Sequence, residues 1–433
     1  MVSKQQKFLP KERVRVGLQD TLPTISEIGS KFCIGNPEEL PPISIWKDTD
    51  VSSEFFHNQL KPLFITMRVF GLFPITLPSR GGPTFELFSS IMAYSMCIYA
   101  VTTVIVCFIV GDLSSVLFSE KIDFLTTIFY SMLILVMFIS ISSPVLLWLD
   151  ASNYVHYINK WTEFQMLFLK VTRNTLSLNV KKRCIFHAFC CSISGIAAIQ
   201  FHFFNPHLRI WQIPGFFSLI TLVNCFVAIW VTTCETLSTA GKSLSRNFKE
   251  ELRRKRYTAQ SIGQYRILWL RLSQLVSRSG GAMEKTSCLF FAVHLFIMTM
   301  SLYGFLYGIT SMTEIPVQSI GMGIASAIAG SAYFRVCNAA HKVHLNVKTE
   351  IKEQLKFVMS SRERQDVLIE VNAFLNTISS NPPVISVAGF FDVNREMLRS
   401  HASTVVTYMI VLLQFNMGQP NDRQMNATQN TIK

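Results

Sequence analysis

A polar stripe near the C-terminus is the part of the sequence best suited to contact water or ions. Thr404, Thr407, Val411 and Gln414 follow one another at 3-4-3 spacing, which places them on one face of a helix. Such a row of hydroxyl and amide groups could line a water path through a membrane. The alternative is a contact between helices, in which the threonine hydroxyls bond to their own backbone.

A second candidate site is formed by aromatic and polar residues at the ends of apolar segments. Binding sites between helices combine apolar walls with a few polar contacts. The alternative is an aromatic belt at the membrane surface, where tryptophan and tyrosine are common. The candidate ligand contacts are His202, Trp211, Phe216, Tyr303, Tyr307 and Gln318.

Motifs that carry catalysis or metal binding are absent from the sequence. It contains no Walker loop, GxSxG elbow, HExxH pair or paired CxxC. His187 and His294 lie inside apolar segments, where a hydrogen-bond partner is more common than a metal ligand. Cys190 and Cys191 are interpreted as small buried hydrophobic residues. We therefore expect no enzyme activity, no metal and no cofactor.

The composition is that of a membrane protein. Of 433 residues, 49% are hydrophobic and only 15% are charged, whereas a soluble domain carries about 25% charged residues. The long apolar runs exclude a disordered chain and a basic nucleic-acid-binding module. The formal net charge of +13 lies mainly in the loops between apolar runs.

Seven membrane helices are predicted, and the last is unusual. The final apolar run, Ala402–Phe415, would reach roughly 21 Å, short of the ~30 Å hydrocarbon thickness. Charged residues such as Asp392 and Arg399 precede it. We expect a long helix with a cytoplasmic lower half and an upper half enclosed by protein. Six earlier runs have full length: Phe85–Val110, Phe124–Leu149, Cys184–Phe204, Ile213–Thr236, Ser287–Met312 and Pro316–Ala340.

The basic residues predict the orientation. One set of loops carries 35 Lys and Arg against 4 on the other side, with Arg335 inside the sixth run. The N-terminus is therefore expected in the cytoplasm and the C-terminus outside. This is the reverse of a G-protein-coupled receptor, so no G protein partner is expected. The single sequon, at Asn426, falls in the extracellular tail and is a possible glycosylation site.

The predicted layout has five parts. They are a cytoplasmic N-terminal region (1–83), six membrane helices with a ligand pocket toward the outside (84–340), cytoplasmic anchor helices (341–401), a pore helix (402–415) and an extracellular tail (416–433). In the anchor, apolar residues recur at helical spacing and must pack on the 237–286 loop, a neighbouring subunit or the membrane surface. These residues are Val343, Val347, Ile351, Leu355 and Val358, followed by Val367, Val371, Phe374 and Ile378.

The last helix carries a recognisable signature. Residues Thr407-Tyr408-Met409-Ile410-Val411-Leu412-Leu413-Gln414-Phe415 match the TYhhhhhQF pattern of the insect gustatory receptor family. The segment Met67–Pro74 (MRVFGLFP) resembles the stretch before the first membrane helix of that family. Seven helices, a cytoplasmic N-terminus and a short outside tail also resemble it.

Within the family, one branch is most similar. Arg335–His341 (RVCNAAH), Asn381–Pro383 (NPP) and Gly389–Arg395 (GFFDVNR) resemble the carbon-dioxide receptor subunits. That branch usually has Gly-Tyr where this chain has Gly389-Phe390. Carbon dioxide as the ligand is implied only by this resemblance.

The family resemblance implies a ligand-gated, non-selective cation channel of four subunits in the plasma membrane of chemosensory neurons. Each subunit would contribute its last helix to the pore, with Gln414 and Phe415 at the outer constriction. Three further subunits, a small-molecule ligand and membrane lipid are the implied partners. The alternatives are a receptor for a sugar or bitter compound, and a non-conducting co-receptor needed for assembly. Without the resemblance, a secondary transporter would also remain open.

Overall fold

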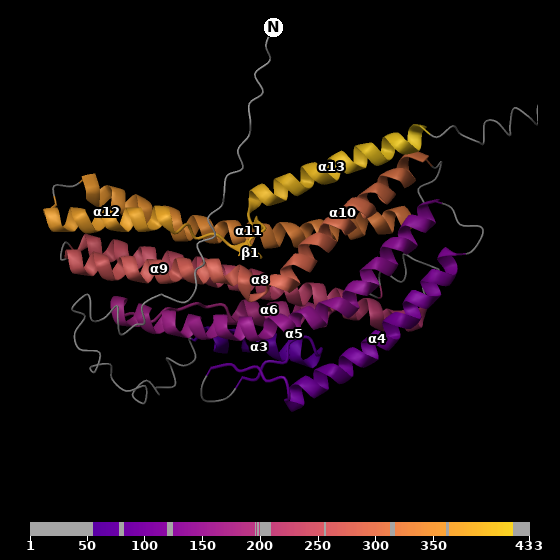
Figure 1. The fold of residues 1–433 in the computed structure, drawn as a ribbon, viewed down its shortest axis with the longest axis horizontal. Coiled ribbons are helices and arrows are strands. Elements are labelled where there is room, and N and C mark those ends of the chain that lie inside the picture. Colours follow the sequence, from indigo (N-terminus) through magenta and orange to yellow (C-terminus); the bar gives the residue numbers. More distant parts are fainter. Residues whose placement is uncertain are drawn as a thin grey trace, which may run out of the picture. The chain divides into compact units, whose positions relative to one another are not determined.

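The structure, a computed structural model, describes residues 55–77, 82–118, 124–194, 196, 199, 209–254, 257–311, 317–360 and 363–418. All of them belong to one compact unit, Ser53–Lys433. The predicted fold class, an all-α polytopic membrane protein, is confirmed (Figure 1).

Five of the described helices are long and apolar enough to cross a membrane. They are α4 (Ser90–Leu117), α5 (Phe124–Thr172), α8 (Ile213–Arg253), α10 (Glu284–Ser311) and α11 (Val317–Ser360). The other two expected crossings correspond to α6 (Lys181–Ser192) and α13 (Arg395–Gly418). Helix α6 ends at Ser192, before the predicted end at Phe204, and residues 200–208 lie outside the described part.

Three helices continue well beyond the apolar runs that predict them. Helices α5, α8 and α11 extend to Thr172, Arg253 and Ser360, so much of the expected loop sequence is helical. A helix gains its backbone hydrogen bonds within itself, so it needs no membrane to persist once one face is packed. The first crossing also starts later than the predicted Phe85, because α4 begins at Ser90. The Ser89 hydroxyl caps this start by accepting a hydrogen bond from the Met92 N–H at 3.2 Å.

The extended ends build a helical anchor together with α9 (Ala259–Ala282) and α12 (Gln365–Ser380). All nine residues of the predicted apolar stripes are buried. They pack against α8 and α9, which was one of the three alternatives. Figure 1 shows α8, α9, α11 and α12 running side by side in this anchor.

Polar contacts fix the anchor helices to one another. The Trp269 indole N–H donates to the Val347 carbonyl at 2.8 Å, and Arg266 Nε lies 2.7 Å from Glu370 Oε1. Burial raises the pKa of Tyr265 to about 12, with a smaller contribution from Glu251, so this side chain is neutral near pH 7.

The helix α3 (Phe56–Val69) connects the N-terminal side of the unit to α5 and α6. The ring of Phe56 lies 4.8 Å from that of Trp161 on α5. The Gln59 side-chain oxygen accepts hydrogen bonds from the backbone N–H groups of Val180 and Lys181, at 3.2 and 3.0 Å. Gln59 therefore satisfies donors at the start of α6 that the helix itself cannot pair.

A short antiparallel hairpin leads into the last helix. Strands β1 (Ser386–Val387) and β2 (Phe391–Asp392) pair across a turn in which Ala388 and Gly389 both have positive φ angles, 53° and 68°. Such a turn favours glycine, and alanine there carries a steric cost. The Asn394 side chain then accepts a hydrogen bond from the Met397 N–H at 2.8 Å and caps α13.

Candidate pore helix and ligand pocket

Helix α13 leaves most of the predicted polar stripe exposed. Thr407, Val411 and Gln414 are exposed, and Thr404 is half-buried. The opposite face packs on α10 and α11 through Val405, which is buried. The three exposed residues of the stripe therefore face away from α10 and α11 in the described part of the chain. The threonine hydroxyls do bond to their own backbone, since Thr404 donates to Ser400 at 3.0 Å and Thr407 to Ser403 at 2.9 Å.

The side chains of Leu413 and Phe415 lie outside the described part, as do Asn426 and the rest of the tail. Tyr408 on one side of the stripe is exposed, as are Val406 and Ile410 on the other side. The backbone at Phe415 is helical, so the TYhhhhhQF signature forms part of one continuous helix that begins at Arg395.

The lower end of α13, in contrast, is held by two contacts to α11. The Arg395 guanidinium donates to the Asn338 side-chain oxygen, from Nε at 3.1 Å and from Nη2 at 2.6 Å. One turn and a half further along, Nδ1 of His401 is hydrogen-bonded to the Tyr333 hydroxyl. The first half of α13 is thus fixed by polar contacts, while in its upper half the described contact is the packing of Leu412 against an apolar cluster of the membrane helices.

The hairpin before α13 adds an aromatic support. The Phe291 ring on α10 lies 5.4 Å from that of Phe391 and 5.5 Å from that of Tyr333, both edge-on. On the other side, the Pro383 carbonyl is hydrogen-bonded to His344 Nδ1 at 3.2 Å. The stretches Arg335–His341 and Gly389–Arg395 therefore meet at this junction between α10, α11 and α13, and Asn381–Pro383 contacts α11 just beyond the first of them.

The ends of the membrane helices opposite this junction form a separate apolar cluster. It gathers the last part of α4, the first parts of α5, α8 and α11, and the last part of α10. Phe216 and Tyr303 are buried within it, and Tyr307 is half-buried at its edge, with its ring 6.2 Å from that of Tyr303. Three of the six candidate ligand contacts are thus brought together.

The remaining candidates lie elsewhere. Gln318 is half-buried and accepts a long 3.5 Å hydrogen bond from the Thr126 hydroxyl, beside the cluster. Trp211 lies on a short 3-10 turn, η3 (Ile210–Gln212), and is 42% exposed, so the structure does not place it in the cluster. His202 lies outside the described residues.

Close helix packing positions the two tyrosines. Gly304 and Gly308 on α10 are four residues apart, and a Cβ at either would collide with Met322 or Ser319 of α11. Small residues at this spacing let membrane helices approach closely. Each glycine directly follows one of the tyrosines, so the close packing of α10 on α11 fixes where the two phenol rings lie along α11.

Several of these contacts were not predicted from the sequence. Asn338 and Arg395 are 57 residues apart, and no spacing rule joins them. Both lie in stretches that were noticed for their resemblance, which was the available signal. Asp112 on α4 is another example, since it accepts from Gln212 at 3.2 Å and lies 3.6 Å from Arg209, tying η3 to α4. Among the described residues, no group of three His, Cys, Asp or Glu side chains could hold a metal ion.

Comparison with known proteins agrees with this architecture. The model of the 7tm chemosensory receptor family matches residues 60–419. Gustatory and odorant receptor 24 of Anopheles gambiae is 30% identical over 373 residues, covering 84% of this chain and 79% of its own length. Gustatory and odorant receptor 22 of the same species is 25% identical (89% and 83% covered), and receptor 21a of Drosophila melanogaster is 24% identical (84% and 81%).

A solved structure has the same fold. The insect olfactory receptor OR5 from Machilis hrabei, determined in complex with eugenol, superposes with a TM-score of 0.61 at 15% identity and covers 84% of this chain and 100% of its own. At that identity the likeness concerns the fold alone. The family match over 360 residues and the Anopheles receptor at 30% identity show that this chain belongs to the insect gustatory receptor family of 7tm chemosensory receptors.

Proposed function

We propose that this chain is a subunit of a ligand-gated, non-selective cation channel in which four subunits each contribute α13 to a central pore. The observation that carries the proposal is the exposed face of α13, where Thr407, Val411 and Gln414 have no partner helix within the described part of the chain. A stripe of two polar side chains and one valine suits neither lipid nor a dry helix contact. It suits a surface that faces water when the pore is open.

The contacts of α13 also suggest how the pore would open. The Arg395–Asn338 and Tyr333–His401 hydrogen bonds hold the lower end of the helix to α11. The upper half carries the signature, and within it Leu412 is half-buried against the apolar cluster. A ligand that shifts α10 or α11 in the apolar cluster would move the upper half about this fixed end. Such a ligand acts only through a difference in its affinity for the closed and open states.

Carbon dioxide is the ligand that we propose, with this chain working in a heteromer. The support is the resemblance of the Arg335–His341, Asn381–Pro383 and Gly389–Arg395 stretches to that branch. A three-atom ligand can gain at most about 4.5 kcal/mol, which corresponds to sub-millimolar or weaker binding. Opening by so weak a ligand requires a small energy gap between closed and open states, or several occupied subunits.

The proposal is tested by recording currents from cells that express the chain alone and together with related subunits. We expect cation currents that rise with dissolved carbon dioxide at constant pH, in the combination and less or not at all in the chain alone. If the currents responded to a sugar or a bitter compound instead, carbon dioxide would be wrong as the ligand, and the channel function would stand. Currents whose ion selectivity is unchanged by every α13 substitution would assign the pore to a partner and make this chain a co-receptor.

Localisation is part of the same proposal. As a multi-pass receptor of this family, the chain is expected in the plasma membrane of chemosensory neurons. An antibody against the native protein should label the surface of those neurons, and labelling confined to internal membranes when its partners are present would contradict it.

A further inference from the structure

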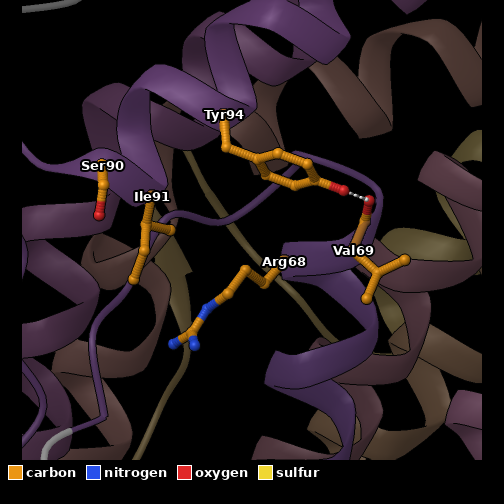
Figure 2. A pocket seen from close by; sticks show the side chains of 5 residues that line it. All are labelled: Arg68, Val69, Ser90, Ile91 and Tyr94. Carbon is orange, nitrogen blue, oxygen red and sulfur yellow. Dashed lines mark hydrogen bonds between the residues drawn. The ribbon is translucent and has the colours of Figure 1, made fainter.

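A recess lies between the end of α3 and the start of α4, away from the pore helix and from the candidate ligand cluster. Its volume is about 250 Å³, and it is lined by Arg68, Val69, Ser90, Ile91 and Tyr94. Figure 2 shows the Arg68 guanidinium extending from α3 toward the side formed by Ser90 and Ile91. The Tyr94 hydroxyl donates to the Val69 carbonyl at 2.9 Å and joins the two walls.

The charge of Arg68 is not neutralised by the described residues. One terminal nitrogen donates to the Ile75 carbonyl, and Nε is buried with no hydrogen-bond partner there. None of the ion pairs between described residues involves Arg68. A guanidinium group has five donors arranged to bind phosphate or carboxylate oxygens in pairs. The recess therefore offers a half-buried positive charge with unused donors and a nearby serine hydroxyl.

The surroundings place the recess at a membrane surface. It opens at the first turn of α4, a helix apolar enough to span the bilayer. Phe88, immediately before this helix, is 99% exposed, and Leu87 and Val69 are also exposed. Apolar side chains in that position are covered by the edge of the lipid bilayer.

An apolar track continues from the recess along α4. Tyr94, Val101, Val104 and Phe108 are exposed and recur at spacings of seven, three and four, which is one helix face. From Tyr94 to Phe108 this face runs roughly 21 Å along the axis. It could accommodate an acyl chain whose polar end sits beside Arg68.

We propose that this recess binds the phosphate of an anionic phospholipid, with Arg68 and Ser90 contacting the headgroup and the α4 face contacting an acyl chain. On the predicted orientation the site faces the cytoplasmic leaflet, which holds the anionic lipids. Phosphate oxygens would satisfy the free donors of Arg68, and the lipid tail would cover the exposed apolar track. The site is independent of whether the chain conducts ions.

The test uses the purified full-length protein and two lipids, dioleoylphosphatidylserine and dioleoylphosphatidylcholine. Native mass spectrometry measures how much of each lipid is retained, and thermal unfolding measures the stabilisation that each produces. We expect the anionic lipid to be retained preferentially. Arg68→Gln should weaken its binding roughly tenfold or more, since a charged hydrogen bond contributes about 1.5–3 kcal/mol. Ser90→Phe, which fills the recess and leaves the Arg68–Ile75 contact in place, should do the same.

Lys61→Gln is the matched control, because Lys61 is an exposed cation on the same helix and does not line the recess. It should leave retention nearly unchanged. The proposal would be overturned if both lipids were retained equally, or if Arg68→Gln and Ser90→Phe retained the anionic lipid as well as the wild type does. It would also be overturned if Lys61→Gln lost as much retention as the recess variants. A third arm uses inorganic phosphate alone: stabilisation as large as that from the anionic lipid would make this a site for soluble anions and reject the lipid.

Discussion

Gln414 and Phe415 stand next to each other at the upper end of α13, and we expect them to affect the current in different ways. A ring of four phenyl groups can close a pore by excluding water, whereas amides can line an open one. Phe415→Ala should raise the basal current. A loss of about 1.4 kcal/mol of closed-state stability would give about tenfold more open channels while the closed state predominates. Gln414→Ala should change conductance or ion preference.

The measurement for this pair is basal current and reversal potential, normalised to surface protein. Val406→Ala is the matched control, because Val406 is exposed on the same helix but lies off the stripe. Unchanged normalised current and selectivity in both variants would remove this segment from the pore. Lower surface expression alone would indicate lost packing, which costs about 3–5 kcal/mol if the phenyl group is buried.

Among Tyr303, Tyr307, Trp211 and His202, we expect at least one to set ligand sensitivity, and the structure makes Tyr307 the best choice. Tyr303 is a buried core residue, so its truncation would lower the folded population itself. Tyr307→Phe removes only a hydroxyl at the edge of the cluster. It should shift the half-maximal ligand concentration about two- to tenfold at unchanged surface level, while Trp211→Ala, outside the cluster, should not.

The crossing of α8 and α11 in the anchor depends on Gly241. A Cβ at this position would lie 2.8 Å from Val347 Cγ2 and 3.1 Å from the Asn346 carbonyl oxygen. The carbonyl belongs to a helix backbone that cannot move aside by itself. Gly241→Leu should therefore separate the helices and destabilise the protein by about 1–3 kcal/mol.

The apparent melting temperature of the purified protein measures this effect. The control is Gly281→Ala on α9, where a Cβ would meet nothing within 4 Å. That change should be neutral or stabilising by up to about 1 kcal/mol, because alanine favours a helix. A Gly241→Leu protein as stable as the wild type would show that α8 and α11 do not pack this closely.

The periodicity of the sequence predicted which helix faces are buried but not what they pack against. Val343 to Val358 repeat at helical spacing, and that signal is local. Their contact with α8, about a hundred residues earlier, requires the fold. The helices predicted to end at Thr236 and Ala340 continue well beyond those residues. Hydropathy falls where the chain leaves the bilayer, whether or not the helix ends there. At the site, residue type identified Phe216 and Tyr303 as apolar walls, whereas their burial as core residues requires the fold, which for Tyr303 is the glycine-mediated packing of α10 on α11.

The whole chain has a predicted orientation that follows from its charge. With 35 basic residues on one side against 4 on the other, the N-terminus is expected inside and the C-terminus outside. A C-terminal epitope should be labelled on intact cells, and an N-terminal epitope only after permeabilisation. The reverse pattern would contradict the orientation and place Gln414 at the cytoplasmic end of the pore.

Assembly is the last property that the exposed face of α13 predicts. Four chains of 49.2 kDa should give a native mass of about 197 kDa for the complete homomer. If four copies of α13 surround an axis, we expect Val411 residues of neighbouring subunits to approach one another, and a disulfide needs a Cβ separation of about 3.5–4.5 Å. Val411→Cys should therefore form covalent dimers under mild oxidation.

The wild-type chain provides the matched control for that experiment. Cys97 and Cys107 are exposed on α4, a helix that we expect to face lipid, so oxidation of the wild-type protein should yield only a low background of dimers. Val104→Cys, on the same α4 surface, should add little to it. If wild type and Val411→Cys cross-link equally, or if the native mass is that of one chain, then α13 does not meet its copies at an axis. The exposed Gln414 amide would then require another partner, because lipid cannot satisfy its hydrogen bonds.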